Sequence, residues 1–279
     1  MVMVSSRGRL PGMARSNFLK LSTGPVAAIA LFAAACGTED SDTAVGTEIG
    51  DTVAIETNAA TSEFSPSSGI TQTGSVEVDG TEIEFVATVP EGFSIGDQAP
   101  VLLAFPPGGQ SIELATSTVE QTYESEALRL GWVVVSPAAP NGQLFFNGSE
   151  ALVPGFVDWV EGWVTPEGGA PHVAGISNGG LSSFRYATEN PDRVRSVVAF
   201  PGFARNDQDR DALEALSSVP IQIYVGGNDT GWIDGANETV QAASAAGVDV
   251  SLEIFPDENH IIDSTSDGVV VFEQLERAR

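Results

Sequence analysis

Ser177 is the residue of this sequence best suited to attack a carbonyl carbon. It is the centre of the pattern Gly-Ile-Ser-Asn-Gly at residues 175–179, which lies between the apolar run HVAGI and a helical stretch from about residue 178 to 188. A nucleophilic serine on such a strand-to-helix corner is strained and needs small neighbours, which the flanking glycines supply. Glycine and serine are common in this chain, so the alternative is a structural turn serine. The corner position favours acyl transfer through Ser177.

A serine hydroxyl needs a neighbouring base, and imidazole is the usual one because its pKa lies near neutrality. The sequence contains two histidines, His172 and His260. His172 begins the strand that leads to Ser177, so an extended strand would hold it about 15 Å away at the wrong end of the sheet. His260 lies in the loop PDENH after the strand-like run VSLEIF. Elimination therefore favours His260 as the base over a histidine of an ordinary surface loop.

The carboxylate that orients the base is expected between the serine and the histidine, at the end of the preceding strand. The run IQIYVGGND ends in Asp229 at that position. Asp234, five residues later, is the alternative, and either residue would also fit an ordinary loop carboxylate in a chain so rich in acid. Asp229 is preferred because it is nearer to the end of the strand.

The oxygen of a tetrahedral intermediate carries negative charge and needs backbone N–H groups that already point at it. One is expected from Asn178, directly after the serine. The other is expected from the loop PPGGQ after the strand VLLAF, where Gly108 and Gly109 let the backbone approach a substrate closely. The sequence does not choose between these two glycines, and a Pro-Gly turn without a catalytic role would look the same.

These residues require a sheet that brings the ends of several strands together. SVEV and TEIEFVATV flank Asp79-Gly80, which predicts an antiparallel β-hairpin at the start of the domain. Apolar strands then alternate with helical stretches; the strands are VLLAF, WVVVS, HVAGI, VRSVVAF, IQIYV and VSLEIF, and the helices lie around 113–130, 152–164, 178–188, 210–217 and at the C-terminus. This alternation predicts an α/β fold with a mostly parallel sheet, helices on both faces and an active site at the carboxyl ends of the strands.

The first 36 residues resemble the signal peptide of a bacterial lipoprotein. A basic start from Met13 to Lys20 precedes the apolar run VAAIALFAAA, which is too short to span a bilayer and ends at Cys36. Small residues before a lone cysteine are typical of a lipobox, although Ala33 stands where leucine is usual. We expect lipidation of Cys36, export to the outer face of the cytoplasmic membrane or cell envelope, and membrane attachment through the lipid alone. The alternative is ordinary secretion with a chance cysteine.

Residues 37–69 are rich in Thr, Ser, Asp and Glu and have no sustained helix or strand period. This composition predicts a disordered acidic tether that leads to a catalytic domain at 70–279.

The net charge of the chain is −26. Removal of the segment before Cys36, which holds four basic residues and no acidic one, makes the net charge −30. Such a field repels polyanions, so nucleic acid is not an expected partner.

The segments VLLAFPPGGQ, LGWVVVSPAAPNG, VAGISNGG, NPDRVRSVVAFPG, YVGGND and NH together resemble the α/β-hydrolase superfamily. The resemblance covers about 70–279 and is closest to the group of poly(3-hydroxybutyrate) depolymerases, feruloyl esterases and acetyl xylan esterases. Members of that group usually have His-Gly where this chain has Pro106-Pro107, and secreted relatives commonly carry disulfides that this chain lacks. The resemblance implies an ester substrate, small or polymeric, and neither a metal nor an organic cofactor. The sequence agrees, since no His/Cys cluster has metal-ligand spacing.

Several aromatic residues are candidates to line a substrate pocket. Phe145 and Phe146 fall in a loop after a strand end, and Trp232 follows the candidate acid. Trp159 and Trp163 have helical spacing, which favours the core.

Taken together, these patterns predict a secreted serine esterase; the alternatives are a catalytically inactive surface binding lipoprotein on a hydrolase scaffold and a serine peptidase. The oligomeric state is left open.

Overall fold

The computed structural model describes residues 64–279. The predicted signal peptide, its Cys36 and the greater part of the predicted tether lie outside the described residues. Within residues 64–279, an eight-stranded sheet has the strand order β1-β2-β5-β4-β7-β8-β9-β10. Its strands are β1 (Ile70–Val78), β2 (Thr81–Val89), β4 (Val101–Phe105), β5 (Val133–Pro137), β7 (His172–Gly175), β8 (Val197–Ala199), β9 (Ile221–Gly226) and β10 (Val250–Phe255). A separate two-residue pair joins β3 (Gln98–Ala99) to β6 (Thr165–Pro166).

The predicted hairpin and parallel sheet are both confirmed. Strand β1 pairs antiparallel with β2 across Asp79 and Gly80, whose φ angles of 49° and 75° suit a tight hairpin turn. Strand β2 pairs antiparallel with β5, and the pairings from β5 onward to β10 are parallel. The carboxyl ends of the parallel strands therefore meet along one edge of the sheet, where the predicted site residues fall.

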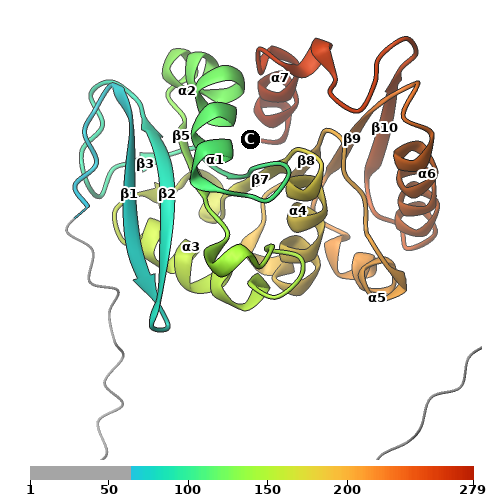
Figure 1. Cartoon of the computed structure of the whole chain (residues 1–279), viewed down its shortest axis with the longest axis horizontal. Helices are drawn as coiled ribbons and strands as arrows, with labels where there is room; N and C mark the ends of the chain where they lie inside the picture. Colours follow the sequence, from blue (N-terminus) through green and yellow to red (C-terminus); the bar gives the residue numbers. More distant parts are fainter. Residues whose placement is uncertain (1–63) are drawn as a thin grey trace, which may run out of the picture. The chain divides into compact units, whose positions relative to one another are not determined.

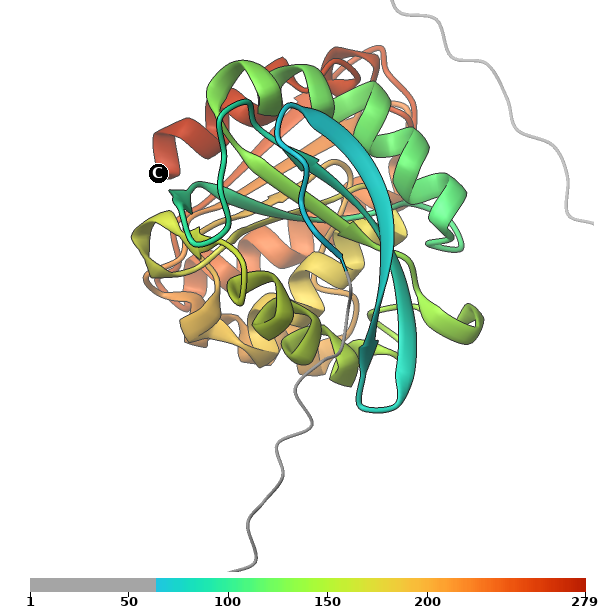
Figure 2. The same ribbon diagram turned by 90° about the vertical axis from the view of Figure 1, so that its left-hand side faces the viewer.

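Helices cover both faces of the sheet (Figures 1 and 2). They are α1 (Ile112–Thr118), α2 (Glu124–Leu130), α3 (Val153–Glu161), α4 (Asn178–Glu189), α5 (Asp207–Asp211), α6 (Thr230–Ala245) and α7 (Val269–Ala278). Successive residues of β4 alternate between the faces: Leu102 packs with side chains of α1, α2 and α7, whereas Leu103 packs with side chains of α3, α4 and α6. The sheet thus has an apolar core on each side, as a buried parallel sheet requires.

The helical stretch predicted at 113–130 is interrupted by one π-helical segment, Val119–Tyr123, between α1 and α2. The helical stretch ends at Gly131, whose φ of 80° gives the left-handed cap that glycine favours. Helix α6, between β9 and β10, was not among the helices named from the sequence. Among the described residues, no helix has the length and apolar character needed to cross a membrane.

Residues 64–69, which the sequence assigns to the tether, contact the domain in the structure. The Phe64 ring packs edge-on against Phe85 at a centroid distance of 4.8 Å, and it also lies 5.5 Å from Trp159. The Ser68 hydroxyl accepts a hydrogen bond from the Gly92 amide at 2.6 Å. Ordered packing therefore begins at least six residues before the predicted boundary at Ile70.

Candidate active site

Ser177 lies at a sharp corner between β7 and α4. Its φ of 58° and ψ of −119° are a strained conformation for a residue with a side chain. The neighbouring glycines make this corner possible: a Cβ on Gly175 would lie 2.2 Å from the carbonyl of Gly179, and one on Gly179 would lie 2.0 Å from the carbonyl oxygen of Phe105. Any side chain at either position would therefore push the corner away from the sheet.

A continuous hydrogen-bonded relay joins three of the predicted site residues. The Nε2 atom of His260 lies 2.8 Å from the Ser177 Oγ, and the Nδ1 atom lies 2.6 Å from the Asp229 Oδ2. A carboxylate accepts hydrogen bonds, so the imidazole tautomer with its proton on Nδ1 donates to Asp229 and leaves Nε2 as the acceptor for the serine hydroxyl. The Asp229 side chain is 16% exposed and that of His260 is 36% exposed, so the relay opens to solvent at the histidine.

The loops that carry Asp229 and His260 are locked together by two glycines. A Cβ on Gly226 would lie 2.0 Å from the carbonyl oxygen of Asn259, and one on Gly227 would lie 2.3 Å from that of Pro256. Backbone hydrogen bonds from Gly227 to Phe255 and from Asn228 to Glu258 complete this contact. Close backbone packing therefore sets the distance between the carboxylate and the imidazole.

Asp234 and His172, the alternatives weighed from the sequence, lie away from the relay. Asp234 is exposed on α6. His172 is buried at the start of β7, where its Nδ1 atom hydrogen-bonds to the Ser196 hydroxyl at 2.7 Å. Burial lowers the pKa of His172 to about 4, and the nearby charges of Arg195 and Arg279 act in the same direction. This histidine is therefore neutral at physiological pH.

The loop after β4 packs directly against the serine corner. Gly108, with a φ of 59°, presents its carbonyl oxygen to the side-chain amide of Asn178 at 2.8 Å. Gln110 was not singled out from the sequence, yet it is fully buried and holds this region together. Its side chain donates to the Ser182 hydroxyl at 2.9 Å and accepts from the Phe145 amide at 2.9 Å. The backbone near Gly108 and Gly109 is thus held beside the first turn of α4.

The three predicted pocket aromatics have different environments. Phe145 is completely buried with its ring 5.5 Å from Phe105, so it belongs to the core and not to a pocket wall. The hydrogen bond from its amide to Gln110 draws it beneath the loop. Phe146 is 7% exposed and lies under the guanidinium group of Arg205, 4.8 Å from the ring centre. Trp232 lies 4.8 Å from the His260 ring and therefore borders the relay.

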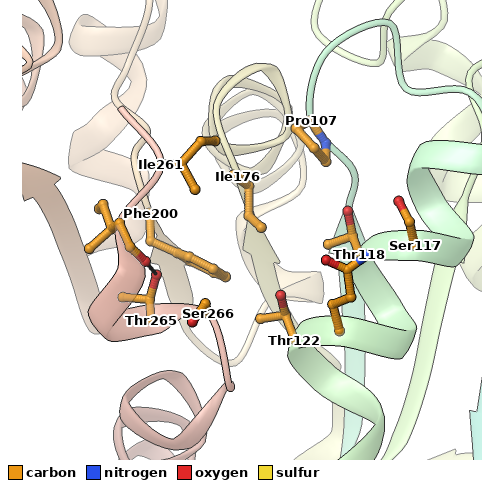
Figure 3. Close-up of a pocket in the computed structure, with 11 residues that line it drawn as sticks. Pro107, Ser117, Thr118, Thr122, Ile176, Phe200, Ile261, Thr265 and Ser266 are labelled. Atoms are coloured by element: carbon orange, nitrogen blue, oxygen red, sulfur yellow. Dashed lines mark hydrogen bonds between the residues drawn. The ribbon is translucent and has the colours of Figure 1, made fainter. Parts of the chain in front are cut away.

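A cavity of about 190 Å³ opens beside the serine corner and was not predicted (Figure 3). Its wall includes Ile176, which precedes Ser177, Ile261, which follows His260, and Pro107, which precedes Gly108. The helical segment at 117–122 also lines the cavity, and the remaining lining comes from Phe200, Ile262, Thr265 and Ser266. The sequence did not predict this cavity, because the segments that line it are far apart in the chain and meet only at the edge of the folded sheet.

Solved structures of other proteins share this architecture. A ferulic acid esterase superposes with a TM-score of 0.58 at 17% identity, covering 75% of this chain and 97% of the other. An S-formylglutathione hydrolase from Agrobacterium tumefaciens gives a TM-score of 0.58 at 17% identity, covering 75% and 94%. A thermostable esterase gives 0.57 at 14% identity, covering 74% of this chain and 60% of its own length. The chain has the α/β-hydrolase fold.

A comparison of the sequence with protein-family profiles also finds a hydrolase family for part of this chain. The profile of the dienelactone hydrolase family matches residues 149–274, a segment that includes Ser177, Asp229 and His260. No protein of curated function matches the sequence significantly. The expected superfamily is thus supported by the fold and by the C-terminal part of the chain.

Proposed function

We propose that this α/β-hydrolase-fold protein is a serine esterase that cleaves carboxylic esters through an acyl-enzyme. The observation that carries the proposal is the relay from the Ser177 Oγ through His260 to Asp229, with contacts of 2.8 and 2.6 Å. Distances in this range allow the imidazole to take the hydroxyl proton as the oxygen attacks. The strained corner at Ser177 holds the hydroxyl in reach of the histidine.

The reaction has two steps. Ser177 Oγ attacks the ester carbonyl carbon while His260 Nε2 takes the hydroxyl proton. Collapse of the tetrahedral intermediate breaks the bond to the alcohol, which leaves with that proton, and the acyl group stays on Ser177. Water then attacks the acyl carbon, His260 takes a proton from the water and returns it to Ser177, and the acid is released. Asp229 orients the imidazole and stabilises its positive charge.

Two backbone amides complete the proposed machinery. The N–H of Asn178 stands at the first turn of α4, where helix amides lack intrahelical acceptors. The second donor comes from Gly108 or Gly109, in the loop that Gln110 and Asn178 hold against that turn. Donors fixed in advance stabilise an oxyanion without reorganisation, which is usually the largest single contribution to such catalysis.

The proposed substrates are carboxylic esters, including the esterified polysaccharide or polyester that the sequence resemblance suggests. The ferulic acid esterase and the other esterases of similar fold are consistent with this class.

We also propose that the protein is exported and anchored through a lipid on Cys36. A Cys36→Ala variant that still partitions into detergent with the membrane fraction would contradict the anchor.

Hydrolysis of p-nitrophenyl acetate and butyrate by the purified protein tests the proposed activity. We expect turnover by the parent and a loss of about 10⁴-fold or more in kcat for Ser177→Ala and for His260→Ala. Ser218→Ala, which removes an exposed hydroxyl elsewhere on the domain, serves as the matched control and should keep the parent rate.

A fluorophosphonate probe separates the esterase from the alternatives. It should label the parent at Ser177 and leave Ser177→Ala unlabelled. A folded parent that resists the probe and hydrolyses no ester would instead support an inactive binding protein. Cleavage of peptide p-nitroanilides at a higher kcat/KM than the matching esters would support a peptidase.

A further inference from the structure

The cavity beside Ser177 contains two hydroxyl groups that have no partner in the described part of the chain. Thr118 and Thr122 line the cavity, and their residues are only 8% and 7% exposed. Neither side chain makes a hydrogen bond to another described residue. The other lining hydroxyls are already used: those of Ser117, Thr265 and Ser266 donate to the carbonyl oxygens of Leu114, Ile262 and Asp263. Each hydroxyl oxygen is open to the cavity and so accessible to solvent, and a ligand that displaces water from it must supply a hydrogen bond in its place.

The helical segment that carries these threonines is fixed against α7. Thr122 lies in the π-helical segment Val119–Tyr123, and such segments are frequent at functional sites. A Cβ on Gly268, at the start of α7, would lie 1.9 Å from the carbonyl oxygen of Thr122. Figure 3 shows Thr118 and Thr122 on one side of the cavity, with Phe200, Thr265 and Ser266 facing them. The backbone that carries Thr122 is therefore held close to the start of α7.

The size and lining of the cavity limit what it accepts. Its volume of about 190 Å³ is below the roughly 300–1,000 Å³ of pockets for drug-sized ligands and is similar to the roughly 150 Å³ of a cavity that accepts benzene. Within residues 64–279 no charged side chain lines the cavity, so an ionised group would be buried there without a counter-charge. A compact uncharged group, no larger than about one six-membered ring, fits these limits.

We propose that this cavity is the specificity subsite for one half of the ester, and that the Thr118 and Thr122 hydroxyls select a short uncharged group bearing a hydrogen-bonding oxygen. The proposal rests on the esterase function proposed above. The position supports it, because Ile176, Ile261 and Pro107 in the wall are direct chain neighbours of the proposed nucleophile, base and oxyanion loop. A group bound here would lie next to the reacting carbonyl.

Two isosteric ester pairs test the subsite with the full-length protein. For the acyl half, p-nitrophenyl methoxyacetate is compared with p-nitrophenyl butyrate; for the alcohol half, 2-methoxyethyl acetate is compared with butyl acetate. Each pair exchanges one methylene for an ether oxygen. The variants Thr118→Val and Thr122→Val remove the hydroxyl with little change in shape. In one of the pairs we expect kcat/KM for the oxygen-bearing ester to fall about tenfold, while that of its apolar partner stays the same or rises.

The controls distinguish loss of the subsite from loss of the enzyme. Thr122→Ser keeps the hydroxyl and should retain the parent preference, and Ser218→Ala removes an exposed hydroxyl that does not line the cavity and should do the same. Thermal melts establish that each variant is folded. The pair that responds identifies whether the acyl or the alcohol half enters the cavity. If the parent hydrolyses p-nitrophenyl acetate but both valine variants keep the parent ratios within twofold in both pairs, the subsite is overturned and the esterase stands. A folded parent that hydrolyses no ester overturns both.

Discussion

Asp229 occupies a position where an aspartate would normally cap a helix, yet its carboxylate is used elsewhere. It is the residue before the first turn of α6, and its side chain caps no amide there. The carboxylate instead accepts a hydrogen bond from His260 at 2.6 Å. An N-capping aspartate is typically worth about 1 kcal/mol to a helix, so the chain forgoes that stabilisation at this residue. This geometry is what the proposed catalysis through His260 requires.

Replacing Asp229 tests that assignment at the residue scale. Asp229→Asn preserves the size of the side chain but removes the charge that stabilises the imidazolium and selects the tautomer with the proton on Nδ1. We expect kcat for p-nitrophenyl acetate to fall by about 10³–10⁴-fold with little loss of stability. Asp234→Asn, which changes an exposed carboxylate five residues away, is the control and should stay within about twofold of the parent. An equal loss in both variants would exclude Asp229 as the orienting acid.

At the scale of elements, the site depends on places where two backbone segments lie so close together that only glycine fits between them. The loops after β9 and β10 meet at Gly226 and Gly227, and the corner between β7 and α4 packs on β4 through Gly179. Each contact places one member of the relay relative to the next. These glycines therefore set the distances within the relay.

Gly226→Ala tests the interlock of the two loops. The added Cβ would lie 2.0 Å from the carbonyl oxygen of Asn259, so the loop that carries His260 must shift. We expect kcat for p-nitrophenyl acetate to fall by about 10²-fold, since displacements of about 1 Å can have that effect. Gly231→Ala is the matched control: no atom lies within 4 Å of its added Cβ, and alanine favours the helix. Full activity in Gly226→Ala, with an unchanged melting temperature, would show that the interlock does not position His260.

The elements also show why parts of the site were not predictable from the sequence. The proximity of Ser177 and His260 could be predicted because the chain offers one GxSxG corner and two histidines, one of which falls at the wrong end of its strand. Helix α6 was missed because its sequence has weak helix signals. Two glycines lie near its first turns, and the Asp229 side chain contacts His260 and does not cap the helix. The cavity was missed because Thr118, Thr122 and Thr265 come from segments that meet only in the folded domain. Phe145 was misplaced because Gln110, whose burial is a tertiary property, draws its backbone inward.

At the scale of the whole molecule, the two ends of the sheet have different roles. The carboxyl end carries the relay and the cavity. The amino end is held by polar contacts with the C-terminus: Arg279 forms an ion pair with Glu167 at 2.6 Å, and Arg195 donates to the carbonyl oxygen of Arg279 at 2.6 Å. Beneath this surface lies His172, with its ring 4.9 Å from that of Trp132. The stability of the fold is therefore linked to a buried histidine that the proposed catalysis does not use.

The burial of His172 predicts how the stability of the molecule depends on pH. Burial lowers the pKa of His172 to about 4 in the folded protein, against about 6.5 in the unfolded chain. A depressed pKa means that the unfolded state takes up a proton first as the pH falls. The contribution of His172 to stability is therefore complete above pH 6.5 and is lost progressively between pH 6.5 and 4. Between pH 6.5 and 5 the loss is about 2 kcal/mol, since one pKa unit corresponds to about 1.4 kcal/mol.

Urea unfolding of the parent and of His172→Asn at pH 7 and pH 5 measures this contribution. The asparagine keeps a hydrogen-bonding group near Ser196 but does not titrate, so its free energy of unfolding should fall by about 2 kcal/mol less than that of the parent over this interval. The same comparison with Ser218→Ala, an exposed residue without a titratable group, provides the control and should keep the parent's pH dependence. Equal pH dependence in the parent and His172→Asn would mean that the folded protein protonates His172 as readily as the unfolded chain, by opening the amino end of the sheet to water.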